Sequence, residues 1–116
     1  MDDTALMIRL LKRLKVEMNG AVTGAMQERG IVYPLNYGYI PGVLGGDGEE
    51  LDVYLIDVNE PVERFTGRII GIAHRENDIE DKLIMAPPDK KFTRDEVERA
   101  VHFQEQYYNT QIELIE

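Results

Sequence analysis

Residues 33 to 52 read YPLNYGYIPGVLGGDGEELD, and they lead into the β-forming run DVYLID at 52–57. The first half contains three tyrosines, the middle is rich in glycine, and the acids Asp47, Glu49 and Asp52 lie at the end of the stretch. Because glycine lets the backbone turn tightly and approach a ligand closely, the pattern predicts a loop-rich functional region that feeds a strand. Carboxylates about 4 Å apart repel by roughly 4 kcal/mol per pair at an effective dielectric of 20, so a packed acidic cluster needs a counter-charge. A hard cation such as Mg²⁺ is a suitable counter-charge.

The composition places limits on the class of protein. A chain of 116 residues with 43% apolar content fits a single compact domain over residues 1–116. The absence of cysteine excludes disulfides, thiolate zinc sites and cysteine nucleophiles. No long apolar run is present, so we expect no membrane span or secretory signal and a cytoplasmic protein. A formal charge of −9 repels nucleic acid, which leaves small, metal-chelated anions as the expected partners.

The segment before this stretch predicts a helix followed by a strand. Apolar residues spaced by three and four over 6–14, with basic residues between them, indicate an amphipathic helix. We expect it to pack on its own domain or on another copy, with membrane-interface binding as the less favoured alternative. A strand is predicted to take over near Arg13, and Asn19-Gly20 favours a two-residue hairpin turn after it.

The segment after it predicts two further strands and a helix. GRIIGIAHR at 67–75 is rich in β-formers and could pair with the strand at 52–57, while KLIMA at 82–86 is closed by Pro87-Pro88. Thr93 and Glu96 form a capping-box pattern that predicts a helix over 94–108. The expected fold class is therefore mainly β with α (α+β), a small, partly closed OB-like β-barrel with a C-terminal helix packed on it.

A second acidic cluster occurs in NDIEDK at 77–82. The period of two in a strand would place Asp78, Glu80 and Lys82 on one face and Asp81 on the other. A carboxylate pair can bind metal while an ammonium neutralises a phosphate oxygen, which is the division of roles that phosphoryl transfer requires. The alternative is that these acids are solvated surface residues and that Lys82 only protects a strand edge from aggregation.

Two histidines, His74 and His102, stand far apart in a chain without cysteine. We favour structural roles for both, because a zinc site needs nearby nitrogen or sulfur ligands.

The quoted motifs resemble those of the soluble family I inorganic pyrophosphatases. YPLNYGYI is similar to the tyrosine-rich loop of that family, and GDGEELDV is similar to its D-G-D-P-x-D-V signature. EDKLIMAP resembles the strand that carries a metal-binding acid and a lysine, and AVHFQEQYY resembles the late helix. The resemblance covers roughly residues 14 to 108 and marks the chain as a short, divergent member.

The resemblance implies Mg²⁺-dependent hydrolysis of inorganic pyrophosphate to two orthophosphates by a homo-oligomer. It also implies roles for individual residues. The metal ligands would be Asp47, Asp52, Asp78 and Glu80; the catalytic residues would be Glu49, Asp52 and Lys82, with Glu49 activating the attacking water; and the substrate-binding residues would be Tyr37, Lys82, Tyr107 and Lys15.

Several positions depart from the family pattern. Glu49 and Glu80 stand for aspartates, Glu50 stands for a proline, and Tyr108 stands for a helix lysine. One added methylene moves a carboxylate by about 1.3 to 1.5 Å, and an error of about 1 Å can cost about a hundredfold in rate. The departures predict weakened activity and keep two alternatives open: a non-catalytic metal- or phosphate-binding module, and a hydrolase of an organic diphosphate.

Overall fold

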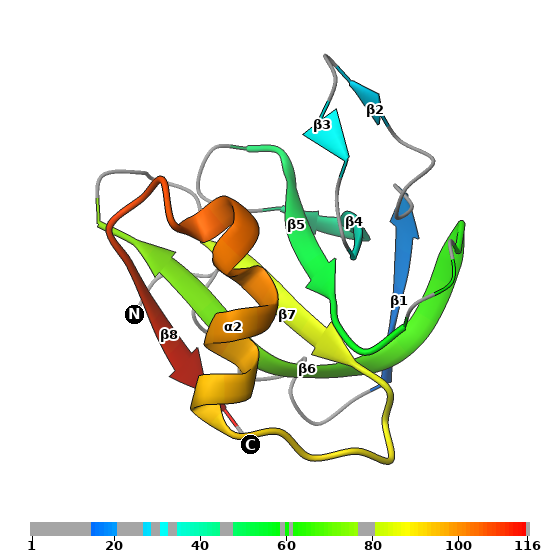
Figure 1. Ribbon diagram of the computed structural model, residues 1–116. Coiled ribbons are helices and arrows are strands. Elements are labelled where there is room, and N and C mark those ends of the chain that lie inside the picture. The colour runs from blue at the N-terminus through cyan, green and yellow to red at the C-terminus, as the bar shows by residue number, and fades with distance from the viewer. Residues whose placement is uncertain are drawn as a thin grey trace.

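The computed structural model is a β-rich domain with one described helix (Figure 1). It describes residues 15–20, 27–28, 31–32, 35–44, 48–58, 60, 62–76 and 81–115, the first three ranges by their backbone alone. The helix predicted for 6–14 lies outside these residues. Among the described residues we find no helix that could span a membrane. In chain order the elements are β1 Lys15–Gly20, β2 Gln27–Glu28, β3 Ile31–Val32, β4 Asn36–Leu44, β5 Glu50–Leu55, β6 Arg64–Arg75, β7 Lys82–Ala86, α2 Arg94–Glu105 and β8 Thr110–Leu114.

Five of the strands form a ring. The sheet order is β1-β4-β5-β7-β6-β8, and β1 pairs with β6 as well as with β4. The β1–β4 ladder joins only Asn19 to Tyr39 and Gly20 to Gly38 among the described residues, whereas β1 and β6 pair from Lys15 to Asn19. The short β1–β4 ladder is thus the narrow point at which the ring closes, and β8 pairs with β6 outside the ring. The predicted α+β class with a partly closed, OB-like barrel is confirmed.

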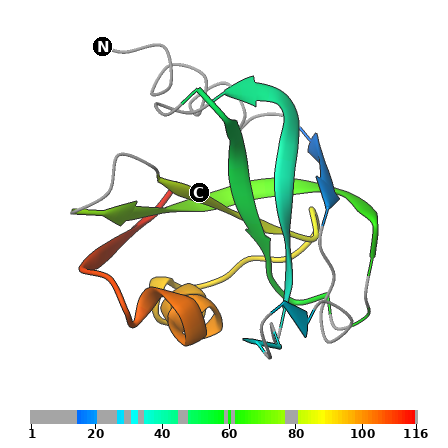
Figure 2. The same cartoon turned by 90° about the horizontal axis from the view of Figure 1, so that it is seen from above.

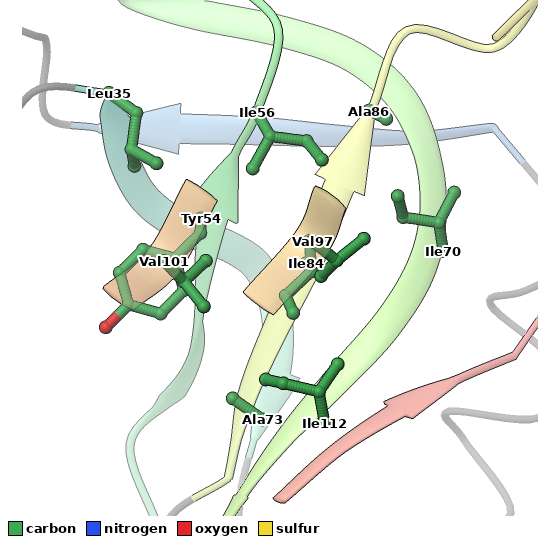
Figure 3. Packing of buried hydrophobic residues seen from close by; sticks show 10 residues of the cluster. All are labelled: Leu35, Tyr54, Ile56, Ile70, Ala73, Ile84, Ala86, Val97, Val101 and Ile112. Carbon is green, nitrogen blue, oxygen red and sulfur yellow. The ribbon is translucent and has the colours of Figure 1, made fainter. Parts of the chain in front are cut away.

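Alternate residues of the central strands serve two different cores. On β5, Leu51, Val53 and Leu55 belong to the cluster inside the barrel, while Tyr54 belongs to the cluster beneath helix α2. This follows from the period of two in a strand. Figure 2 shows α2 lying on one side of the strands, and Figure 3 shows the second cluster that it covers. The buried members of this outer cluster are Leu35, Tyr54, Ile56, Ile70, Ala73, Ile84, Ala86, Val97, Val101 and Ile112.

A bulge in β6 changes which residues of this long strand face each core. Ile69 pairs with Met85 and Gly71 pairs with Ile84, so Ile70 is an extra residue in the ladder. Because the extra residue shifts the alternation, Ile69 and Ile72, three positions apart, both belong to the cluster inside the barrel. A bulge also increases local bending, which suits a strand of 12 residues that wraps around a small barrel.

Helix α2 begins where the capping box predicts. The Thr93 hydroxyl accepts a hydrogen bond from the Glu96 amide at 3.2 Å, and the Glu96 carboxylate accepts one from the Thr93 amide at 2.9 Å. The helix ends at Glu105, three residues before the predicted end at 108. The chain turns at 106–108 because it must return along β6 as β8, a strand that the sequence analysis did not predict.

Three local predictions are wrong. Asn19-Gly20 does not form a turn, because both residues continue β1 and pair with β4. The glycine-rich region contains a strand of nine residues, β4, whose ladder is interrupted between Tyr39 and Leu44, where Pro41 cannot donate a hydrogen bond. The strands predicted at 52–57 and 67–75 are not neighbours, because β7 lies between β5 and β6 and runs parallel to β5.

Candidate functional site

Three of the predicted site residues meet at one carboxylate oxygen. The Lys82 Nζ lies 2.5 Å from Oδ2 of Asp52, and the Tyr37 hydroxyl donates a hydrogen bond to the same oxygen at 2.9 Å. The Lys82 ammonium also lies 5.7 Å from the centroid of the Tyr37 ring. An acid, an ammonium group and a phenol therefore share one small region at the start of β5.

The strand register explains why these residues meet. Val53 pairs with Leu83 in the parallel β5–β7 ladder, so the preceding residues Asp52 and Lys82 are side by side at the start of both strands. Tyr37 on β4 is directly opposite Tyr54, two residues after Asp52 and on the same face of β5. The site is thus on the outer face of the barrel, which α2 covers farther along.

The burial of Lys82 excludes the alternative that this residue only protects a strand edge from aggregation. Its side chain is 7% exposed and that of Asp52 is 29% exposed, and β7 is an interior strand of the sheet. The suggestion that Lys82 protects a strand edge is therefore wrong. A lysine this deeply placed needs a paired anion, because an uncompensated buried charge is costly.

A hydrogen bond ties the start of β5 to β4. The Glu50 carboxylate accepts a hydrogen bond from the Gly42 amide at 2.7 Å, and Gly42 has a positive φ of 78° that favours glycine. Glu50, which replaces the proline of the family pattern, thereby ties the end of β4 to the start of β5. Its neighbour Glu49 is exposed on the bend before the strand.

The remaining predicted residues are not joined to this group by the described contacts. Tyr107 is 75% exposed in the turn after α2, and Lys15 is the first residue of β1 and is described by its backbone alone. The other three predicted metal ligands, Asp47, Asp78 and Glu80, lie outside the described residues. Within the described ranges, no group of three or more histidines and acids is arranged to hold a metal ion.

A buried ionic network that the sequence analysis missed lies next to the site. Glu105 at the end of α2 accepts hydrogen bonds from Arg75 Nε at 3.0 Å, from Arg75 Nη2 at 2.6 Å and from the Thr110 hydroxyl at 2.8 Å. The Tyr54 hydroxyl donates to Oε2 of the same carboxylate at 2.5 Å. The spacing did contain a signal, because Glu105 follows Val97 and Val101 at intervals of four on the apolar stripe of the helix.

The network shifts the ionisation of its members in consistent directions. Burial favours the neutral acid, but the hydrogen bonds from Arg75, Tyr54 and Thr110 outweigh it and hold the pKa of Glu105 below its usual value. Burial, together with the hydrogen bond to the Glu105 carboxylate, raises the pKa of the Tyr54 hydroxyl well above its usual value. Tyr54 therefore stays a neutral donor to a charged Glu105 throughout the neutral pH range.

Tyr108 lies over this network. Its ring centroid is 3.7 Å from the Arg75 guanidinium carbon, a distance typical of a cation–π contact. The position where the resembling family carries a lysine is thus occupied by an aromatic ring that covers a buried arginine.

His74 on β6 forms a separate cluster with two carboxylates. Its Nδ1 lies 2.9 Å from the Asp81 carboxylate and its Nε2 lies 2.8 Å from the Glu113 carboxylate. Burial lowers the pKa of His74, but the hydrogen bonds and charges of the two acids outweigh it and raise that pKa above its ordinary value. With a carboxylate at each ring nitrogen, His74 links β6, the start of β7 and β8, in keeping with the predicted structural role.

Comparison with known proteins gives a consistent family. A family model described as "Inorganic pyrophosphatase" matches residues 11–113. An inorganic pyrophosphatase of Haemophilus influenzae is 33% identical over 88 residues, covering 68% of this chain and 49% of that protein. One of Sulfolobus acidocaldarius is 42% identical over 62 residues, covering 51% of this chain and 36% of that protein. The chain thus spans half or less of the length of these curated relatives.

Solved structures support the same fold. The crystal structure of an inorganic pyrophosphatase from Ehrlichia chaffeensis superposes with a TM-score of 0.67 at 18% identity, covering 87% of this chain and 86% of that one. At this identity the likeness concerns the fold alone.

Proposed function

This chain belongs to the inorganic pyrophosphatase family, and from that premise we propose that it hydrolyses inorganic pyrophosphate to two orthophosphates. The observation that carries the proposal is the convergence of Lys82 and Tyr37 on Asp52 Oδ2. A diphosphate presents several anionic oxygens, and a site for it needs donors beside acids that can hold cations. The three residues combine both kinds of group at adjacent strand positions.

The donor chemistry fits a hard cation. Every proposed ligand is a carboxylate, and oxygen ligands of this type suit Mg²⁺. Asp52 is the described member of the set, and its side chain opens to solvent at the beginning of β5. We propose that Asp47, Asp52, Asp78 and Glu80 hold Mg²⁺. When bound, the ion would neutralise phosphate charge and lower the pKa of a water molecule.

The other proposed roles belong to side chains of the chain itself. Glu49 would accept a proton from the attacking water, and its exposed position on the bend before β5 gives it access to solvent. Lys82 would neutralise charge on a phosphate oxygen, because its ammonium group carries a positive charge and N–H donors at the place where Asp52 begins the site. Tyr37, together with Tyr107 and Lys15, would bind phosphate oxygens. Attack on one phosphorus breaks its bond to the bridging oxygen, and that oxygen leaves on the second orthophosphate.

A phosphate-release assay with pyrophosphate and a Mg²⁺ titration tests this function. We expect turnover by the unaltered chain and its loss in Asp52→Asn, a change that removes charge while keeping the side-chain shape. Asp89→Asn is the matched control, because Asp89 is an exposed acid to which no role is assigned. Unchanged turnover in Asp52→Asn would show that the assignment is wrong.

One observation favours a second candidate, a binding module without turnover. Tyr108 packs on Arg75 where the resembling family has a lysine, so the end of the helix offers less positive charge to an anion. Calorimetry with Mg²⁺ and pyrophosphate, run beside the release assay, separates the two: heat of binding without phosphate release supports the module. Replacing pyrophosphate with a nucleoside diphosphate in the same assay tests hydrolysis of an organic substrate.

We also propose a cytoplasmic homo-oligomer, following the family resemblance. Light scattering on the purified chain measures the number of subunits directly. A mass of one chain, 13.3 kDa, across the working concentration range would contradict it.

A further inference from the structure

An unbroken series of contacts joins the buried network to the candidate site. It runs from Arg75 on β6 to Glu105 on α2, then to Tyr54 on β5 and to Tyr37 on β4, whose hydroxyl donates to Asp52. Four elements, β4, β5, β6 and α2, contribute to it. None of the site roles proposed above uses Tyr54, Glu105 or Arg75.

Tyr54 is the link between the two halves of this series. Its side chain is completely buried in the outer cluster (Figure 3). At one end its hydroxyl is held by Glu105 at 2.5 Å, and its ring centroid lies 5.1 Å from that of Tyr37 with the planes inclined by 59°. The two tyrosines are also a direct cross-strand pair of the β4–β5 ladder. The rings of Tyr54 and Phe103 form a T-shaped pair with their centroids 6.0 Å apart.

The anchor of Tyr54 is itself rigidly held. Glu105 receives two hydrogen bonds from the planar guanidinium of Arg75 and one from Thr110, so its carboxylate has a fixed position. A tyrosine ring whose hydroxyl is tied to such an anchor cannot tilt freely about its side-chain bonds. A phenylalanine at the same place would keep the packing and lose this restraint.

We propose that Tyr54 is a positioning residue, held by Glu105 and Arg75, that fixes the Tyr37 ring and so directs the Tyr37 hydroxyl toward Asp52. The proposal rests on the proposed function for its effect on turnover. The Tyr37 ring leans on Tyr54, so a tilt of Tyr54 displaces the donor that meets the Asp52 carboxylate. Catalytic groups are sensitive to displacements well below 1 Å, which makes this restraint measurable in rate.

A double-mutant cycle tests the proposal. Tyr54→Phe removes only the hydroxyl, and Glu105 keeps its bonds to Arg75 and Thr110, so the variant should fold. We expect kcat for pyrophosphate to fall by about threefold to tenfold with little change in KM. In the Tyr37→Phe background the same change should have no further effect, because the donor that Tyr54 orients is already absent.

A control of matched stability separates positioning from general weakening. Ile112→Val trims one methyl group from the same outer cluster on β8, away from Tyr54 in Figure 3, and should lower stability by a similar amount without lowering kcat. If Tyr54→Phe leaves kcat unchanged, or lowers it equally in both Tyr37 backgrounds, the proposal is overturned.

A second measurement keeps the two proposals distinguishable. With ring-labelled tyrosine, NMR signals of Tyr37 should shift in Tyr54→Phe and stay in place in Ile112→Val, whether or not the protein turns over pyrophosphate. Shifted signals without turnover in any variant would support the positioning role and refute the hydrolytic function. Turnover with unshifted Tyr37 signals in Tyr54→Phe would support the hydrolytic function and refute the positioning role.

Discussion

Replacing Asp52 with asparagine should destabilise the fold more than removing its partner Lys82 does. At the observed separation of 2.5 Å, two unit charges attract by about 7 kcal/mol at an effective dielectric of 20. Desolvation offsets much of this attraction, and the Asp52 side chain is 29% exposed, so the net loss is smaller than the roughly 3 to 5 kcal/mol of a fully buried pair. We expect Asp52→Asn to cost about 2 kcal/mol, because it removes the carboxylate charge that contacts the buried Lys82 ammonium.

Lys82→Met should cost less than about 1 kcal/mol. The variant leaves Asp52 charged, but water can reach that carboxylate, and a methionine of similar length fills the apolar space along β7. The double variant should recover most of the loss of Asp52→Asn, since it removes both charges of the Asp52–Lys82 pair.

Urea unfolding of the four proteins in a metal chelator measures these free energies as one cycle. The chelator keeps cation binding from contributing to stability. Two results would refute the view that Lys82 depends on Asp52 as its counter-ion. One is an Asp52→Asn variant as stable as the unaltered chain, and the other is a Lys82→Met variant that loses as much stability as Asp52→Asn.

Three other expectations concern stability. His74→Gln should lower the free energy of unfolding most below about pH 6.5, because the bonds of His74 to Asp81 and Glu113 favour the protonated ring. The loss should fade as pH rises through the raised pKa of His74. Denaturant unfolding at a series of pH values measures this loss, and a loss that grows with pH would contradict the expectation. Thr93→Ala should cost about 1 kcal/mol by removing the helix cap, with thermal melting as the readout and an unshifted melting temperature as the contrary result. Gly67→Ala should cost about 2 kcal/mol, because the new Cβ would lie 2.5 Å from a backbone carbonyl of β7; a variant of normal stability would show that the strands can separate at that point.

The elements that the sequence predicts well are those with local signals. The capping box at Thr93 starts α2, Pro87-Pro88 end β7, and β-forming residues mark β5 and β6. Strand β8, with the sequence TQIEL, has little signal of its own and forms because β6 offers an edge to pair with. Likewise β4 is glycine-rich, and its pairing with β5 overrides a composition that is typical of loops.

The same contrast holds for the site. Family resemblance predicted roles for Tyr37, Asp52 and Lys82, but their meeting at one oxygen depends on strand register across 30 residues, which no local pattern contains. The buried Glu105 was missed because a glutamate in an amphipathic helix usually faces water. Its charge becomes favourable only beside Arg75, which belongs to another element.

The alternation along β5 makes this strand unusually sensitive to insertions and deletions. Its odd-numbered side chains fill the barrel, and its even-numbered ones include the Asp52 carboxylate and the Tyr54 phenol. Six consecutive positions must therefore satisfy both the packing of the core and the geometry of the site. Deleting a single residue there would turn an acid toward the barrel core and a leucine toward the candidate site. Ordinary replacements, in contrast, can retune the chemistry on one side while the packing on the other is left alone, which is how a member of this family could drift far in its reactive groups and still keep its barrel.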